Sequence, residues 1–282
     1  MTTWTFNLPA APVLDLRAAS GRIELVAGPE DHASVELDAD GRRGAALVED
    51  SRVEVVGERL IVHVPAHGAR RRSPLGLSLT GSIRLRIVVP DGTALEATLA
   101  SVGMEALVTL RAATVKSASG DVRLEHVTGP AHVRLASGDV RFGHIAGDFS
   151  AATASGDIRG GDVGGDFAGR TVSGALDVGR LAGDVRARTV SGRVSIGELR
   201  RGDADVASTS GRQQIRVAPG LELDLDVATV SGVIHSELDP GPASGAGGAG
   251  SDAPVDLRLR ARTVSGDVAI LRSHDAGMAA TS

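Results

Sequence analysis

The chain has neither cysteine nor tyrosine, and its 282 residues include one tryptophan, four phenylalanines and a single lysine, Lys116. The lack of cysteine excludes disulfides and thiolate metal sites. Because aromatic residues are so scarce, the core must be built from Val, Leu, Ile, Ala and Thr. The same scarcity argues against a carbohydrate site, since Trp or Tyr faces usually grip sugar rings.

Long hydrophobic runs and an excess of positive charge are also missing. No stretch approaches the roughly 20 apolar residues needed to cross a bilayer. The first residues, MTTWTFNLPAAPVLDL, lack a basic start followed by an unbroken apolar run, so we expect no signal peptide and a cytoplasmic protein. The formal net charge of −5 argues against a nucleic-acid binder.

What the chain does contain is a repeat of eighteen residues marked by Ser-Gly pairs. A second glycine follows many of these pairs nine residues later, so each repeat has two turns. A fixed period of this length is typical of stacked supersecondary units. The pairs begin at Ser119, Ser137, Ser155, Ser173 and Ser191, and with slips in the spacing at Ser210, Ser231 and Ser265.

The segments between the glycines alternate between apolar and polar residues, which is typical of half-buried strands. Val122, Val140 and Ile158 repeat at one inner position, and β-branched residues favour strands over helices. The sequence therefore predicts an all-β, single-domain β-solenoid resembling a parallel β-helix, with two strands in each coil of about 18 residues.

The repeat pattern also suggests how the chain is organised. Residues 1–98 are rich in strands but out of phase, so we interpret them as an irregular β cap continuous with the solenoid. An arginine run, Arg70 to Arg72, indicates an exposed loop. We expect a regular solenoid over 99–238, a flexible Gly/Ala/Ser/Pro loop over 239–254, a final coil over 255–272 and a disordered tail over 273–282.

The tandem pattern seen in KSASGDV, RLASGDV and RTVSGDV, with the preceding segment IRLRIVVPDGTALEATLAS, resembles a bacterial family of β-solenoid domains of unknown function named "putative adhesin". The resemblance covers nearly the whole chain and implies the same fold. It implies no catalytic residues, because the family has none established.

Repeated carboxylates raise the question of calcium. Their rows are Asp121, Asp139 and Asp157 at one turn, and Asp148, Asp166 and Asp184 at the other. Calcium needs six to eight oxygen ligands, whereas each turn offers one carboxylate. Arginines two residues further on, such as Arg123 and Arg141, predict surface ion pairs instead. We expect no cofactor and no metal.

Two histidines are one period apart, His126 and His144, and Asp162 occupies the next position of the row. Two imidazoles and a carboxylate can hold zinc or iron. These residues lie at the bend and nothing in the sequence forces them to converge. We therefore favour a pair of surface histidines and keep the metal site as the alternative.

A row of valines, Val172, Val190, Val230 and Val264, lies between the Thr and Ser rows, where strict alternation points it outward. We call these four residues the valine row; alanines hold the position in earlier repeats. Either the bend folds the side chains back into the core, or they form a contact surface for a partner.

No nucleophile elbow, P-loop or dinucleotide fingerprint occurs in the sequence. We therefore predict a non-enzymatic scaffold or protein-interaction module that binds an unknown protein, or itself, through an edge or an end of the solenoid. One alternative is a solenoid enzyme or ligand-binding protein acting on a polysaccharide. The other is a surface adhesin exported by a non-standard route.

Overall fold

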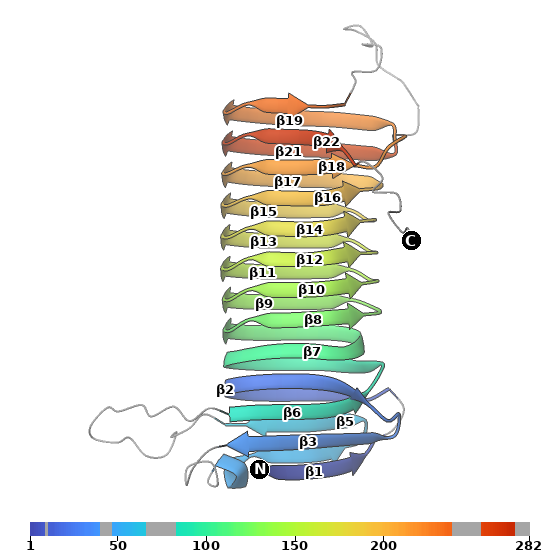
Figure 1. Ribbon diagram of the computed structural model, residues 1–282, viewed down its shortest axis with the longest axis vertical. Helices are drawn as coiled ribbons and strands as arrows, with labels where there is room; N and C mark the ends of the chain where they lie inside the picture. The colour runs from blue at the N-terminus through green and yellow to red at the C-terminus, as the bar shows by residue number, and fades with distance from the viewer. Residues whose placement is uncertain (9–10, 40–46, 66–82, 239–254, 274–282) are drawn as a thin grey trace, which may run out of the picture. The chain divides into compact units, whose positions relative to one another are not determined.

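A computed structural model describes residues 1–8, 11–39, 47–65, 83–238 and 255–273 (Figure 1). The predicted loops at Arg70–Arg72 and 239–254, and the tail from residue 274, lie outside the described residues. Twenty-two strands fill the described part, in which only residues 47–50 are helical. The predicted all-β solenoid class is confirmed.

No helix in the described ranges is long and apolar enough to span a membrane. The chain divides into two compact units, residues 1–156 and 157–282. The finer domain boundaries expected from the repeat phase, such as the one at residue 98, stay predictions.

The first unit begins with strands of mixed direction. β3 pairs antiparallel with β1 and β6, and β4 pairs antiparallel with β5, whereas β2 runs parallel to β5, β6 and β7. These strands are β1 (Thr2–Asn7), β2 (Val13–Gly28), β3 (His32–Ala39), β4 (Arg52–Val56), β5 (Arg59–Val64) and β6 (Ile83–Pro90).

The rest of the first unit is regular and parallel. Strands one coil apart pair in register at an offset of eighteen residues, as Val140 with Val122 and Phe149 with Ala131. Alternate side chains are buried along β9, as the pattern predicts, whereas in β8 and β10 two residues separate the last two buried side chains. The strands are β7 (Thr93–Ser119), β8 (Val122–Val127), β9 (Ala131–Ser137), β10 (Val140–Ile145) and β11 (Phe149–Ser155).

The Ser-Gly glycines make the turn between the two strands of a coil. Gly156 has a φ of +141°, and a Cβ there would lie 2.1 Å from the carbonyl oxygen of Gly138 one coil away. Only glycine permits this approach. In the first repeat Val102 holds the glycine position, and β7 continues through it without a turn.

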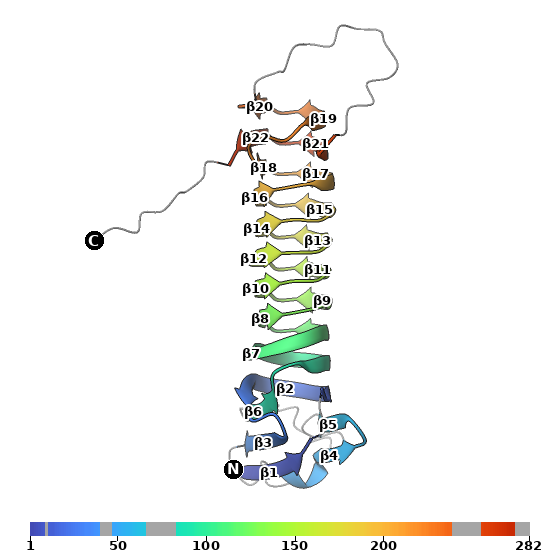
Figure 2. The same ribbon diagram turned by 90° about the vertical axis from the view of Figure 1, so that its right-hand side faces the viewer.

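The second unit continues the pattern with two rows of parallel strands, which Figure 2 shows as two columns. The even-numbered strands form one row and the odd-numbered strands the other. They are β12 (Ile158–Val163), β13 (Phe167–Ser173), β14 (Leu176–Leu181), β15 (Val185–Ser191), β16 (Val194–Leu199), β17 (Gly202–Ser210), β18 (Gln213–Val217), β19 (Leu223–Ser231), β20 (Ile234–Ser236), β21 (Leu257–Ser265) and β22 (Val268–Arg272).

The coil that comes last in the sequence is not last in the stack. β21 pairs with β17 on one side and with β19 on the other, and β22 likewise lies between β18 and β20 (Figure 1). We call β21 and β22 the inserted coil, and β19 and β20 the end coil. Residues 218–222 therefore connect β18 to an end coil that is not its neighbour. The space between the two coils is occupied by β21 and β22, which come later in the chain.

Charge favours this order. The outward face of β21 carries arginines, whereas the outward faces of β17 and β19 carry aspartates. Arg258 lies 3.6 Å from Asp203 of β17 and 3.1 Å from Asp224 of β19, and Arg262 donates to Asp226 at 2.9 Å. A stack in sequence order would put Asp224 directly beside Asp203. Like charges in register destabilise a sheet, so the inserted order is favoured.

A buried polar cluster fixes the inserted coil on β17. The fully buried Gln213 donates from Nε2 to Ser208 Oγ and to the carbonyl oxygen of Arg262, both at 2.9 Å. Ser208 Oγ in turn donates to Thr263 Oγ1 at 3.0 Å. Hydrogen bonds inside an apolar core cost much to break, so a shift of β21 by one residue is disfavoured.

Candidate interaction surface

The carboxylates of the Gly-Asp turns bind the backbone of the neighbouring coil. Asp121 accepts the amide hydrogen of Asp139 at 2.9 Å, and Asp157 accepts that of Ala175 at 2.6 Å. The other turn repeats this, because Asp184 accepts the amide of Asp203 at 2.9 Å. We missed this role from the sequence, although an aspartate recurring directly after a turn glycine was the available signal.

The predicted ion pairs accompany these backbone contacts. Arg141 lies 2.7 Å from Asp139 on its own strand edge and 3.6 Å from Asp121 one coil away. Arg123, by contrast, pairs with Glu105 and Glu125. Because these groups are largely exposed, each pair adds only about 0–1 kcal/mol to the stability of a coil.

The two candidate histidines lie in register on neighbouring strands of the first unit, and both are exposed. Asp162 belongs to the second unit, where Arg180 binds its carboxylate through Nε at 3.0 Å and through Nη2. This hydrogen bond raises the pKa of Arg180. Within the described ranges, no three His, Asp or Glu side chains are grouped so that they could hold a metal ion.

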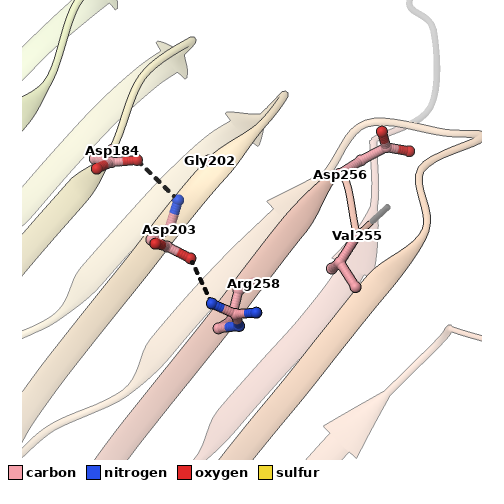
Figure 3. Close-up of a pocket in the computed structure, with 6 residues that line it drawn as sticks. All are labelled: Asp184, Gly202, Asp203, Val255, Asp256 and Arg258. Carbon is pink, nitrogen blue, oxygen red and sulfur yellow. Dashed lines mark hydrogen bonds and ion pairs between the residues drawn. The ribbon is translucent and has the colours of Figure 1, made fainter. Parts of the chain in front are cut away.

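A small pocket of about 240 Å³ lies where the inserted coil begins (Figure 3). Its lining residues are Asp184, Gly202, Asp203, Val255, Asp256 and Arg258. Each carboxylate has a partner: Asp184 accepts the Asp203 amide, Asp203 pairs with Arg258, and Asp256 accepts the amide of Glu222 at 3.0 Å. These contacts give each carboxylate a role in the coil turns.

The valine row is an apolar feature that the coils leave outside the core. Val172, Val190, Val264 and Val230 are 48%, 46%, 52% and 83% exposed, so the bend does not fold them inward. The flanking Thr and Ser residues pair in register from strand to strand, which puts the row at one level on successive coils. On β17 the position is held by the exposed Thr209.

Because of the inserted coil, the side chains of this row do not follow one another in chain order. Val264 lies on β21, so it comes between Thr209 of β17 and Val230 of β19. Five strands thus present Val, Val, Thr, Val and Val side by side, over about 19 Å at the usual strand spacing. Isolated exposed valines need no explanation, whereas a contiguous row is typical of a contact surface.

Polar rows border the valines on both sides. Arg170 and Arg188, two residues before Val172 and Val190, are exposed and lie in register on β13 and β15. Exposed serines follow the valines at the turn, as at Ser191. The surface therefore combines an apolar centre with arginine on one flank and hydroxyl groups on the other.

The first unit has alanine where the second has valine. Ala118 and Ala136 are exposed at this level, and the smaller side chains leave a shallow groove of about 500 Å³. The groove is lined by Thr98, Leu99, Lys116, Ser117, Ala118, Arg134, Leu135 and Ala136. The two units thus offer different surfaces from the same repeat position.

Comparison with family models finds a match to the middle of the chain. The model of the Toastrack DUF4097 family matches residues 78–160. Among curated proteins, none matches the chain by sequence.

Solved structures show remote likenesses. A "putative adhesin" from Parabacteroides distasonis is 12% identical with a TM-score of 0.43, and one from Bacteroides fragilis is 11% identical with a TM-score of 0.41. A "putative lipid binding protein" from Parabacteroides distasonis is 10% identical with a TM-score of 0.30. Each likeness covers 96% of this chain and 96% of the other.

Proposed function

We propose that this β-solenoid is a non-enzymatic interaction module that binds a protein partner through the valine row. The observation that carries the proposal is the exposure of four valines at one level of successive coils. Burying a valine that is half exposed contributes about 1 kcal/mol, so the row as a whole can support a specific contact.

The flanks indicate the chemistry of the partner. Arg170 lies beside the valines and favours a partner surface with a carboxylate next to an apolar strip, whereas the neighbouring Arg188 pairs with Asp205 at 3.3 Å. The partner surface is elongated, because the row follows the stacking direction of the strands. The carboxylates described above are engaged in coil turns, which supports a binding role over an acid–base one.

The test compares capture of partners by matched variants of the purified chain. Val172→Thr and Val190→Thr keep the side-chain shape, and Thr209 already occupies the equivalent position on β17. The control is Val56→Thr on β4, where the valine is 55% exposed but outside the row. Partners are cross-linked in native extract and quantified by mass spectrometry.

We expect partners captured by the wild type and by Val56→Thr to be depleted with the double variant. Sedimentation of the same three proteins separates self-association from capture of another protein. Equal capture by all three would refute the role of the valine row.

A further inference from the structure

The end coil has a neighbour on one side only. β19 pairs with β21 and β20 pairs with β22, and within the described ranges no strand lies on the opposite side (Figure 1). Its inward side chains are uncovered: Leu225 is 38% and Ile234 45% exposed, whereas their partners one coil below, Leu259 and Val268, are 0% and 1% exposed. An open strand edge with an apolar row is a template for a further strand.

The charge pattern of the stack indicates what that strand carries. Aspartates on β17 have arginines on both sides, since Asp205 pairs with Arg188 of β15 at 3.3 Å and Asp203 with Arg258 of β21. Asp224 and the neighbouring Asp226 of β19 receive arginines from β21 alone. The alternation of arginine and aspartate strands therefore stops at an anionic strand.

Other parts of this chain fit the edge poorly. Two end coils meeting edge to edge in antiparallel fashion would bring the Asp224 and Asp226 rows together, which like charges disfavour. Of the edge strands of the first unit, β1 has the sequence TTWTFN and no arginine, and β4, RVEVV, has one arginine that pairs with Glu54 of the same strand. Residues 239–254 and 274–282 contain no arginine or lysine, and the arginines of 40–46 and 66–82 follow one another without alternating apolar residues.

We propose that the open edge of β19 binds an extended segment of another protein in which apolar residues alternate with arginines. The segment adds to β19 as a strand, its backbone pairs with the free edge, its apolar residues cover Leu225, and its arginines meet Asp224 and Asp226. β21, with the sequence LRLRARTVS, already does this on the other side of β19. This site is separate from the valine row, so the result of its test does not depend on whether the valine row binds a partner.

The probe is a fluorescent synthetic peptide of sequence LRLRARTVS. To stop the peptide from replacing β21, we use a locked protein in which a disulfide joins β19 to β21. The disulfide is formed by Val230→Cys and Val264→Cys, which lie in register on the two strands. The natural chain has no cysteine that could compete. Binding is measured by fluorescence anisotropy at low and at physiological salt. The control peptide has glutamine in place of its three arginines.

We expect saturable binding of the arginine peptide that weakens with salt, and weaker binding of the glutamine peptide. In the locked protein, the double substitution Asp224→Asn and Asp226→Asn should raise the dissociation constant of the arginine peptide about fivefold. The matched control, Asp177→Asn on the exposed face of β14, should leave this dissociation constant unchanged. Equal binding of the two peptides, or no loss with Asp224→Asn and Asp226→Asn, would overturn the proposal.

Discussion

Replacing Gly156 by alanine tests the turn on which every regular coil depends. Gly156 has a φ of +141°, a conformation that side chains other than glycine rarely adopt. The added Cβ would lie 2.1 Å from the carbonyl oxygen of Gly138 and 2.6 Å from its carbon. Since both are backbone atoms of the neighbouring coil, no side-chain rotation relieves the overlap.

The expected loss of stability follows from these contacts. Backbone strain at such a φ costs about 1–3 kcal/mol. To make room, the two coils must separate locally by about 1 Å, which breaks the hydrogen bond from the Gly138 amide to the Ser155 carbonyl, 2.9 Å long, at a cost of about 1 kcal/mol. Gly156→Ala should therefore lower the free energy of unfolding by about 2–4 kcal/mol.

Urea unfolding followed by far-ultraviolet circular dichroism measures this loss, and hydrogen exchange in β9 and β11 locates it. Gly103→Ala is the control, because Gly103 has no positive φ and no atom within 4 Å of an added Cβ. It should change stability by no more than about 0.5 kcal/mol. If the two variants unfold at the same urea concentration, the turn geometry is wrong.

Two further predictions address the coil order and the pH response. Cysteines at Thr209 and Val264, about 4.8 Å apart on paired strands, should oxidise to a disulfide. Cysteines at Thr209 and Val230, about 9.6 Å apart, exceed the limit of about 7 Å and should stay reduced on a non-reducing gel; the opposite result would mean a stack in sequence order. The hydrogen bond from Arg59 lowers the pKa of Glu96 below 4.5, so the pair stabilises the fold above that pH, and its contribution disappears as the pH falls through the folded-state value. Glu96→Gln should therefore lower the urea midpoint at pH 7, and this loss should shrink as the pH is lowered below 4.5; a loss that stays constant with pH would contradict the pairing.

Much of the fold could be predicted because the repeat carries its register in the sequence. The eighteen-residue spacing of Val122 and Val140 is the offset at which their strands pair. For Val172, between a Thr and a Ser, the sequence left open whether the bend folds the side chain into the core, and the structure has it 48% exposed. Alternation thus determines the face of a side chain within a strand, whereas at the bend it leaves two outcomes.

The order of the last coils was missed because both coils satisfy the same local pattern. Leu223–Ser231 and Leu257–Ser265 align residue for residue, so apolar spacing and glycines fit either order. Besides the inward pair Val227 and Ala261, the charges distinguish them, since Asp224 faces solvent in one coil and Arg258 in the other. That difference is readable in the sequence, but its effect depends on which strand is the neighbour, a non-local property.

The role of the turn carboxylates was missed for a related reason. Asp121 was expected to interact with an arginine side chain, whereas it also accepts the amide hydrogen of Asp139. Backbone donors are present at every residue, and a sequence does not reveal which of them a neighbouring coil leaves within reach.

The inserted coil has a consequence for how the protein is made. A ribosome releases residues in chain order, and coils up to β18 can add one after another as they emerge. The end coil then has no strands to pair with, because β21 and β22, which separate it from β17 and β18, have not yet been synthesised. The end coil can therefore pack only after residues 257–272 have been synthesised, although its own residues precede them in the chain.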